Sequence, residues 1–524
     1  MTLSSGLSTI LSLSLALVLV LARSSSTTVH AIQPKLRGAL QEDRYRTDKT
    51  KKKVLIVGAG MSGLTAARAL IAAGNEVEIL EYQDRIGGRV WSEELPRGGY
   101  TELGAGHFRS NMPNVLKYIT YYDLDLIAMN DGLPVYTNED KYGDLFFGQA
   151  SDLTTLEQWK LHYNETNISP TSLMNYYLHL NGLDTSRVIE ESYPSEEEVA
   201  KFDGVTFAQV MRQSGASEGI LQIFEDHCGG LLDAAALTIV TDLAYHMGDQ
   251  NVFRIAEGNE LLPQAMAREI VEIAQKNVIH TTQNVIDIDH SNKDEMVKVT
   301  AVDRETGKET VFEADEIIST VSFELFRDND VTIYPDWSLS KREMFDHFDW
   351  GNSMKVVCQT ESPTWLNRGV HGWPMAGTND RIWERVIDIT GASRHGNLFF
   401  YLNGDNSRKV AEMFPVEESN AHLKKRAEYV IDEFNKDMPG LIEECIEPTS
   451  IYWDEVEWMK ASFGQPPLGE ANWMIQEWEE PEGGRIWLSG DFTSMKTGWV
   501  EGAIEAGMRV AKAIDSNAKM VFEE

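Results

Sequence analysis

Cysteine is scarce in this chain, and its scarcity excludes several kinds of protein. Only three cysteines, Cys228, Cys358 and Cys445, occur among 524 residues. Their spacing matches no zinc motif, so no metal site is expected, and three widely separated thiols do not make a disulfide framework. At most one bridge could form, and we expect the thiols to be buried and free.

Positive charge is also in short supply. The chain has 47 lysine and arginine residues against 82 aspartate and glutamate residues, which gives a formal net charge of −35. Residues 1–53 are basic, so residues 54–524 alone carry a net charge of −41. Such a surface repels nucleic acid and anionic membranes, and neither is expected as a partner. The acidic surface could attract cationic substrates, although solubility alone explains it equally well.

No apolar run near the N-terminus reaches the length of a membrane span. The run Ile10–Ala22 is shorter than the roughly 20 residues that a span needs, and it has the length of a signal-peptide core. We predict a signal peptide over 1–31 and a polar, basic leader over 32–53. The protein is therefore expected to be secreted and extracellular, with no stable membrane association, although an uncleaved anchor would look similar. Sequons at Asn164 and Asn167 agree weakly with glycosylation.

What the chain does contain is a dinucleotide-binding pattern between Val54 and Glu81. It reads VLIVGAGMSGLTAARALIAAGNEVEILE, an apolar strand, a glycine-rich turn, a small-residue helix and a second strand that ends at an acid. The glycines permit a tight turn, close approach of a pyrophosphate and close packing of the helix on the strand. Free amides at the helix N-terminus attract phosphates. Glu81 lies where an acid binds ribose hydroxyls and repels a 2′-phosphate, so NADP is disfavoured.

A second glycine cluster follows the first. It comprises the pairs Gly87-Gly88 and Gly98-Gly99 and then Gly104 and Gly106. These glycines would bring the backbone close to a bound cofactor a second time. Since dehydrogenases that use NAD do not need this second approach, the spacing favours a flavin over NAD.

The fold class that the chain predicts is α/β: a Rossmann-like FAD-binding domain, an interleaved α+β substrate-binding domain and a helical insertion. A chain of this length is too long for one core. The expected segments are FAD-binding residues 54–115, a helical and substrate-binding insertion over 116–248, FAD-binding residues 249–322, a substrate-binding domain over 323–445, and a closing FAD-binding segment over 446–516 that also supplies pocket residues.

Several motifs resemble the flavin-dependent amine oxidases, and among them the L-amino-acid oxidases. The resemblance covers nearly all of Val54–Ile514. Its most specific parts are VGAGMSGLTAARAL with Glu81, Gly87-Gly88-Arg89, Glu102-Leu103-Gly104-Ala105, Ser489-Gly490-Asp491 and Gly498-Trp499-Val500-Glu501-Gly502-Ala503.

The resemblance implies non-covalent FAD. Some relatives bond a cysteine to the flavin, but the matching stretch here, Lys460–Gly464, has none. Asp491 stands where the family usually has glutamate, so its contact with the cofactor could be direct, lengthened or bridged by water. The implied cofactor residues are Gly58, Gly60, Met61, Ser62, Gly63, Glu81, Gly88, Arg89, Gly104, Ala105, Val285, Gly490, Asp491, Gly498, Trp499 and Val500.

The same resemblance implies two catalytic residues. Lys355 matches a lysine that holds a water near flavin N5 and assists reoxidation by dioxygen. The alternative is a surface lysine on an edge strand, which its apolar neighbours disfavour. Trp499 matches the aromatic residue beside the substrate amine, and Phe463 is expected on the opposite wall. For the substrate carboxylate the resemblance implies Arg109, with Trp383 nearby, because arginine binds carboxylates in a bidentate way.

The predicted reaction is oxidative deamination of an L-amino acid to a keto acid, ammonia and hydrogen peroxide, with hydride transfer to flavin N5 and dioxygen as the second substrate. No side chain need act as a base, and His107, His227 and His246 are interpreted as structural. A homodimer is also envisaged.

Three alternatives remain open at this point. A polyamine or monoamine oxidase is favoured by Gly104-Ala105-Gly106 and the acidic surface. A non-oxidase flavoprotein, such as a desaturase or isomerase, is disfavoured by Lys355 and Trp499. A secreted interaction protein without activity is disfavoured by the retention of every flavin-contact motif.

Overall fold

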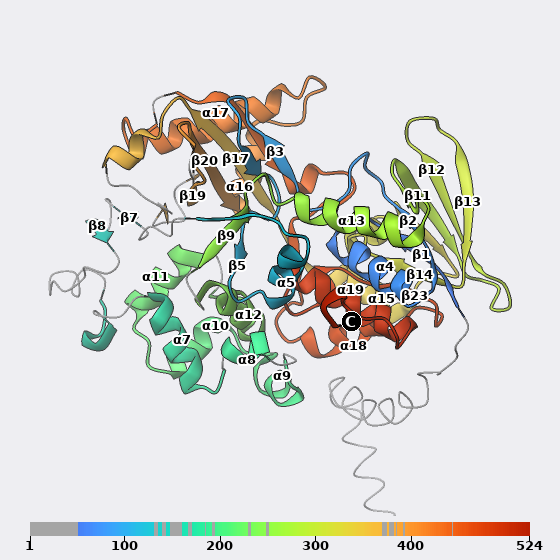
Figure 1. Ribbon diagram of the computed structural model, residues 1–524. Coiled ribbons are helices and arrows are strands. Elements are labelled where there is room, and N and C mark those ends of the chain that lie inside the picture. The colour runs from blue at the N-terminus through green and yellow to red at the C-terminus, as the bar shows by residue number, and fades with distance from the viewer. Residues whose placement is uncertain are drawn as a thin grey trace, which may run out of the picture. The chain divides into compact units, whose positions relative to one another are not determined.

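The fold is organised around β1 (Lys53–Val57), a strand at the centre of a parallel sheet in the computed structural model (Figure 1). The sheet has five strands in the order β10-β2-β1-β14-β23. The others are β2 (Glu76–Leu80), β10 (Ile279–His280), β14 (Glu316–Ser319) and β23 (Ile486–Leu488). These strands come from segments far apart in the sequence, so the predicted assembly of the cofactor domain from separated segments is confirmed.

The structure describes residues 51–129, 135–138, 143–146, 160–165, 170–183, 185–190, 194–228, 232–247, 251–368, 375–376, 382–383, 385–390, 393–442 and 444–523. The predicted signal peptide over 1–31 and nearly all of the leader over 32–53 lie outside the described residues. The sequon residue Asn167 does too, whereas Asn164 is described and exposed.

Both faces of the parallel sheet are covered, as expected for strands that are apolar throughout. Val54 and Ile56 face the core formed with α4 (Met61–Ala72), α13 (Leu261–Ala274) and α19 (Val500–Ile514). Leu55 and Val57 face a second core formed with α14 (Phe323–Arg327), α15 (Leu339–His347) and α18 (Ala471–Glu479). The alternation of neighbouring side chains between two cores makes β1 the most enclosed part of the domain.

A four-stranded sheet in the order β13-β12-β11-β15 extends the cofactor domain. Its strands are β11 (Gln283–Asp289), β12 (Val297–Asp303), β13 (Glu309–Ala314) and β15 (Thr332–Tyr334). β15 pairs in parallel with β11. The predicted boundary between residues 322 and 323 is therefore too early, because α14, β15 and α15 pack on the cofactor domain rather than on the substrate-binding sheet.

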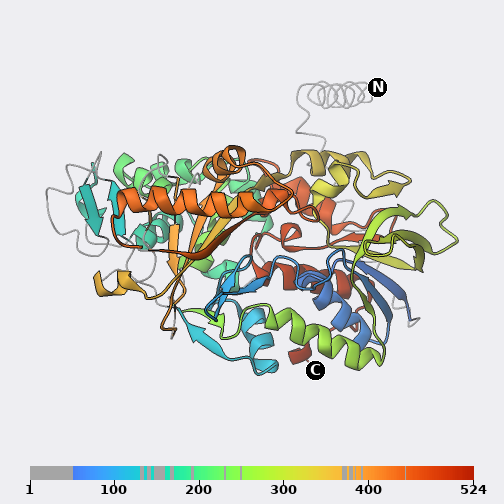
Figure 2. The same ribbon diagram turned by 90° about the horizontal axis from the view of Figure 1, so that it is seen from above.

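The substrate-binding sheet has seven strands in the order β21-β17-β20-β19-β18-β7-β8. They are β7 (Val135–Asn138), β8 (Gly143–Phe146), β17 (Ser353–Thr360), β18 (Met375–Ala376), β19 (Arg385–Asp388), β20 (Gly396–Asn403) and β21 (Ile446–Tyr452). The long helix α17 (Ala421–Asp437) packs along β21 and β17, and Figure 2 shows it lying across the sheet. α16 (Gly404–Met413) follows β20.

Two predicted segment boundaries cross this sheet. β21 belongs to it, although residues 446–516 were assigned to the cofactor domain, because β21 pairs antiparallel with β17. β7 and β8 belong to it as well, although they lie within the predicted insertion over 116–248. Hydrogen bonding between strands that are distant in sequence decides these memberships, and local composition does not reveal it.

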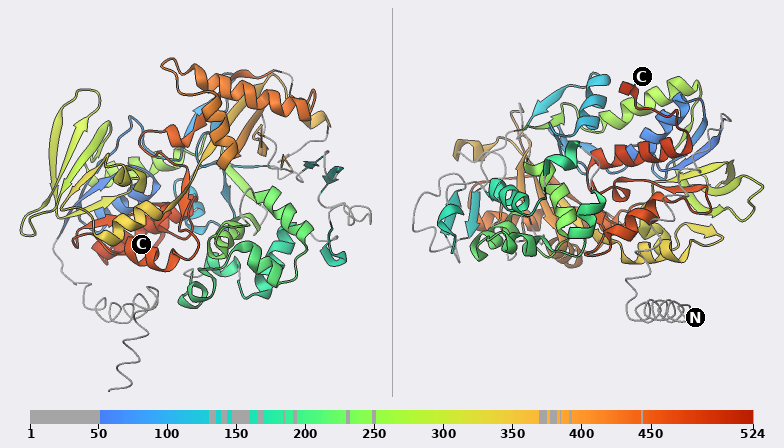
Figure 3. Two further views of the ribbon diagram at one scale, coloured as in Figure 1. Left: turned by 180° about the vertical axis from the view of Figure 1, so that it is seen from behind. Right: turned by 90° about the horizontal axis from the view of Figure 1, so that it is seen from below.

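The predicted helical insertion is confirmed. Figure 3 shows it as a cluster of helices, which are α7 (Pro170–Leu180), α8 (Thr185–Glu190), α9 (Glu196–Phe202), α10 (Phe207–Gln213), α11 (Glu218–Cys228) and α12 (Ala236–Met247). Capping boxes at Ser195 and Thr206 fix where α9 and α10 begin. None of the helices in the described ranges is both long and apolar enough to span a bilayer.

Short elements connect these parts. α5 (Pro113–Tyr121) packs against α19, and a three-stranded sheet joins β5 (Phe108–Arg109), β9 (Val252–Ile255) and β6 (Leu126–Ala128). Two antiparallel strand pairs are also present: β3 (Ser92–Glu94) pairs with β4 (Tyr100–Glu102), and β16 (Asp349–Gly351) pairs with β22 (Phe463–Gln465), which is distant in the sequence.

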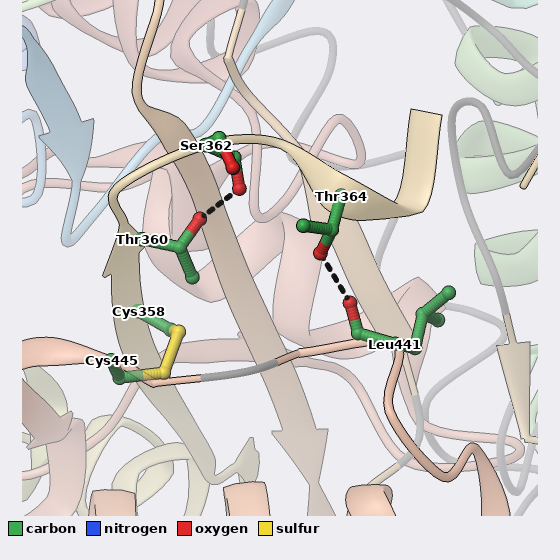
Figure 4. The surroundings of a disulfide bond; sticks show 6 residues. All are labelled: Cys358, Thr360, Ser362, Thr364, Leu441 and Cys445. Atoms are coloured by element: carbon green, nitrogen blue, oxygen red, sulfur yellow. Dashed lines mark hydrogen bonds between the residues drawn. A yellow bond between two sulfur atoms is a disulfide. The ribbon is translucent and has the colours of Figure 1, made fainter. Parts of the chain in front are cut away.

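Cys358 and Cys445 form a disulfide, so the expectation of free thiols is wrong for this pair (Figure 4). Their Cα atoms lie 5.2 Å apart although 87 positions separate them in the sequence. Cys358 is in β17, and Cys445 directly precedes β21. The antiparallel pairing of these two strands brings the thiols together, which spacing in the sequence cannot show.

Candidate active site

A cavity of about 660 Å³ opens beyond the ends of β1 and β14. This volume lies within the range of ligand-binding pockets, and ligands of open parallel sheets bind at the carboxyl ends of the strands. Nearly all predicted cofactor residues line it, namely Gly58, Gly60, Met61, Ser62, Glu81, Gly88, Arg89, Gly104, Ala105, Val285, Gly490, Asp491, Gly498, Trp499 and Val500.

The turn between β1 and α4 has the geometry of a phosphate site. Gly58 adopts a φ of 106°, which favours glycine. A β-carbon at Gly63 would overlap the carbonyl oxygen of Gly58, so this residue serves the packing of helix on turn and lies behind the cavity wall. Within the described chain no side chain caps the N-terminus of α4. Its first N–H groups are therefore available to an anion.

Glu81 ends β2 at the cavity, as the motif predicts. Its carboxylate accepts hydrogen bonds from the backbone N–H of Ala59 at 2.7 Å and of Gln83 at 2.8 Å. Burial raises the pKa of Glu81, and the two backbone hydrogen bonds oppose that rise. Each carboxylate oxygen keeps capacity for a further bond, which fits a ribose hydroxyl group.

Arg89 and Asp491 form an ion pair on the cavity wall. The other nitrogen of the guanidinium donates to the second carboxylate oxygen at 3.2 Å and to the carbonyl oxygen of Ser462 at 2.8 Å. The backbone N–H of Gly498 also donates to Asp491, at 2.9 Å. The charge of Asp491, which stands where the family usually has glutamate, is thus neutralised by Arg89. Together the two residues link the segments of Arg89, Ser462 and Gly498 in the cavity wall.

Lys355 lies on β17, between β20 and β21, and is only 4% exposed. The alternative of a surface lysine on an edge strand is therefore wrong. Its Nζ donates to the carbonyl oxygen of Glu102 at 2.9 Å and to that of Gly104, and it lies 4.7 Å from the centroid of the Phe399 ring. Burial lowers the pKa of Lys355 to about 8, opposed by the charge of Glu102.

Glu102 is a buried acid to which the sequence assigned no role of its own beyond its place in the motif Glu102-Leu103-Gly104-Ala105. Glu102 is 1% exposed. Its carboxylate accepts hydrogen bonds from the backbone N–H of Asn259 at 2.9 Å and from the Ser92 hydroxyl at 2.8 Å. Burial raises the pKa of Glu102 to about 7. These bonds fix the end of β4, and so they fix the two carbonyl groups that hold Lys355.

The aromatic wall contains both predicted residues. Trp499, directly before α19, meets the His107 ring edge to face at 5.7 Å and the Tyr245 ring at 5.1 Å. Phe463 from β22 and the unpredicted Phe399 and Tyr401 from β20 also line the cavity. Phe399 and Tyr401 alternate along one strand, and Tyr401 is the register partner of Lys355. This period-two pattern was the signal that could have revealed them.

Arg109 and Trp383 do not line the cavity with the other predicted residues. Arg109 is buried in β5, and its neighbour Phe108 lines the cavity. Because successive side chains of a strand point to opposite faces, the side chain of Arg109 points away from the cavity. Its Nε donates to Nε2 of His107 at 3.3 Å. Trp383 packs against Phe434 of α17 at 4.8 Å in the core of the substrate-binding sheet. Direct substrate contacts by these two residues are not supported.

The helical insertion contributes residues that the sequence did not single out. Thr238, Ile239 and Thr241 of α12 line the cavity, and so do His107 and Met112 from the segment before α5. In the described part of the chain, no cluster of histidine, cysteine, aspartate or glutamate is arranged to hold a metal ion. The cavity thus has a polar end built from the glycine motifs and an end rich in aromatic and aliphatic side chains.

Comparison with known families agrees with this arrangement. The chain belongs to the flavin-containing amine oxidoreductases, whose family model matches residues 61–515. A model of pyridine nucleotide-disulphide oxidoreductases matches residues 19–97, which include the first strand, turn and helix. The protein is therefore an FAD-dependent amine oxidoreductase with a mixed α/β fold.

Individual relatives are distant but align over most of their length. The chain is 24% identical to the flavin-dependent L-tryptophan oxidase of Lentzea aerocolonigenes, with 89% of this chain and 98% of the relative covered. It is 23% identical to the putrescine oxidase of Kocuria rosea, with 88% and 95% covered. A solved structure of putrescine oxidase bound to putrescine superposes with a TM-score of 0.71 at 20% identity, over 89% of this chain and 99% of that one. At this identity the superposition supports the fold alone.

Proposed function

We propose that this protein is an oxidase that converts an L-amino acid to a keto acid, ammonia and hydrogen peroxide. The observation that carries the oxidase assignment is the buried Lys355, which two carbonyl groups hold on the wall of the cavity that the predicted FAD-binding residues also line. FAD held along Gly58, Glu81 and Arg89 would supply the chemistry, which is acceptance of the hydride from the amine-bearing carbon and transfer of the electrons to dioxygen.

The residues of the chain supply position and environment. Trp499 and Phe463 flank the site of the amine and align its carbon with the flavin ring. Lys355 orients a water molecule, and the surrounding aromatic side chains exclude the rest of the solvent. No base is required of the protein, because an amine that binds in its neutral form already carries the electron pair that drives hydride loss.

An L-amino acid is proposed as the substrate because the relatives include an L-tryptophan oxidase and because a cation lies behind the wall. The guanidinium of Arg109 donates to His107, and His107 lines the cavity. The positive potential of Arg109 therefore reaches a substrate carboxylate through the imidazole rather than by direct contact. This arrangement replaces the bidentate clamp that the sequence predicted.

A monoamine without a carboxylate is the second candidate. It is favoured by the position of Arg109 outside the cavity wall. A diamine is less favoured, because each carboxylate on the described wall already has a partner. These pairs are Glu81 with two backbone N–H groups, Asp330 with Lys460, Glu457 with the Tyr82 hydroxyl and Asp491 with Arg89.

Peroxide release from the purified, yellow protein tests the proposal. The panel comprises L-amino acids, D-amino acids, monoamines and diamines. Turnover of L-amino acids alone would support the proposal, and turnover of monoamines alone would move the protein to the second candidate. Arg109→Met should raise KM for an amino acid at least tenfold and leave any turnover of the matching decarboxylated amine unchanged. A loss of both activities would show that Arg109 serves only the fold.

A further inference from the structure

Two residues of α12 that line the cavity each carry a buried hydroxyl group without a hydrogen-bond partner among the described residues. They are Thr238, which is 4% exposed, and Thr241, which is 1% exposed. A threonine inside a helix usually donates back to the carbonyl group four positions earlier. Thr65 in α4 does so, at 2.7 Å from the carbonyl oxygen of Met61. Because a buried hydroxyl without a partner destabilises the fold, its retention at a cavity indicates a ligand.

The two threonines lie on the face of α12 that also carries Tyr245. Thr238, Thr241 and Tyr245 are spaced by three and four positions, so they share one face of α12. The Tyr245 ring packs against Trp499. With the helical rise, Thr241 lies about 6 Å and Thr238 about 10 Å along the axis from Tyr245. A substrate whose amine lies beside Trp499 reaches these hydroxyl groups with its far end.

The group that meets the two hydroxyls should be uncharged. A buried charge needs an opposite charge close by. The acidic side chains of the described wall are paired as stated above, and the two flexible cations are occupied as well. Lys355 donates to backbone carbonyl groups, and Lys460 pairs with Asp328 and Asp330. A second carboxylate would therefore lack a counter-charge among these groups. Glu81 and Glu457 have only uncharged partners, but Glu81 belongs to the cofactor residues and Glu457 is exposed, so neither acid is assigned to a second ammonium at the two hydroxyls.

We propose that Thr238 and Thr241 bind an uncharged hydrogen-bonding group, a hydroxyl or a carboxamide, at the end of the substrate remote from its amine. This proposal rests on the proposed amine oxidation and narrows its substrate class. A site that leaves buried polar groups unpaired discriminates strongly against an analogue that lacks the matching group. The pair of hydroxyls thus acts as a specificity filter, separate from the residues that hold the flavin.

Matched substrates test the filter. The pairs are L-tyrosine with L-phenylalanine and, for an enzyme that needs no carboxylate, tyramine with phenethylamine, and the readout is the rate of anaerobic reduction of the bound flavin. The wild type should reduce its flavin at least tenfold more efficiently with the hydroxylated member. Thr238→Val and Thr241→Val should each remove most of this preference and leave the efficiency with the plain member within about twofold. Equal losses on both members, or no preference in the wild type, would overturn the proposal.

Thermal stability separates a ligand role from a structural one. Thr238→Val and Thr241→Val keep the shape of the side chain, and in the absence of substrate they should leave Tm unchanged or raise it, since they remove a hydroxyl without a partner. Thr185→Val is the matched control, because the buried Thr185 hydroxyl of the same insertion donates to Asn175 at 2.9 Å. It should lower Tm and leave the substrate preference unchanged.

The outcomes distinguish failure of this inference from failure of the proposed function. If Thr238→Val and Thr241→Val lower Tm as Thr185→Val does, the hydroxyls serve the fold and the inference is wrong. If no amine reduces the flavin, the proposed function is wrong, and this inference, which rests on it, is overturned with it even when Tm behaves as expected. If amines with and without a distal polar group reduce the flavin equally well, the proposed function holds and the proposed binding role of Thr238 and Thr241 is wrong.

Discussion

The two ends of the cavity differ in how their polar groups are satisfied. At the cofactor end, Glu81 is held by backbone N–H groups, Asp491 by Arg89 and Gly498, and Lys355 by two carbonyl groups. At the substrate end, Thr238 and Thr241 have no partner within the described residues. A site whose polar side chains already have partners is preorganised for one ligand, the cofactor. Hydroxyl groups without a partner can instead discriminate between substrates that have a matching polar group and substrates that lack it.

The largest effect is expected where the backbone itself forms the cofactor site. Gly63→Val should abolish FAD retention, because its side chain would overlap the carbonyl of Gly58 and push α4 away from β1. The ratio of flavin to protein absorbance after purification measures this. Gly204→Ala is the control, since a β-carbon there meets nothing within 4 Å. Retention of FAD by Gly63→Val would contradict a rigid cofactor end.

Lys355→Met should have the next largest effect. We expect flavin reoxidation by dioxygen to slow by about 100-fold, in keeping with the loss of one positioned polar group at a reacting centre. Anaerobic reduction by substrate should change much less, because methionine keeps the apolar contacts of the lysine stem. Stopped-flow measurement of the two half-reactions separates them. An equal loss in both would assign Lys355 to substrate binding or to the fold.

The disulfide between Cys358 and Cys445 allows the stability of the substrate-binding sheet to be tested separately from the cofactor-binding motifs. Replacement of Cys358 and Cys445 by serine should lower the free energy of unfolding by about 2–4 kcal/mol, because the bridge closes a long loop. The kcat of the folded protein should change less than twofold. Denaturant titration and peroxide release measure the two quantities. A large loss of kcat without a loss of stability would show that the substrate-binding sheet controls the cavity directly.

The smallest effect concerns Glu102, whose pKa is raised by burial from its ordinary value of about 4.5 to about 7. Between these pH values the folded state binds the proton more tightly than the unfolded state, so the contribution of this group to stability falls as pH rises. Glu102→Gln should remove that dependence. The stability of the wild type relative to the variant should decrease by about 3 kcal/mol from pH 4.5 to pH 7.5. A constant difference would mean that Glu102 titrates normally.

The cofactor end was predictable because its determinants are contiguous. The backbone conformation of short segments forms this end: the turn after β1, the end of β2 at Glu81 and the segment at Gly104. The glycines in these segments show where a residue must be small, and they can be recognised in the sequence. Lys355 could be placed because its apolar neighbours predicted a buried strand. The strand order around it, and therefore the partners of its ammonium group, depended on pairing across hundreds of residues.

The substrate end was predictable only in outline. Arg109 and Trp383 were assigned by position in a resemblance, but strand alternation turned Arg109 away from the cavity and core packing enclosed Trp383. Thr238 and Thr241 gave no signal, because two threonines in an apolar helix are ordinary until the cavity beside them is known. Secretion and a homodimer stay predictions.

The most direct test of the account is anaerobic mixing of the purified flavoprotein with an L-amino acid that has a hydroxyl group at its far end, followed by admission of oxygen. We expect that the flavin is bleached, that its colour returns with oxygen, and that about one hydrogen peroxide forms per flavin. Flavin that stays oxidised with every amino acid and amine tested would contradict this expectation.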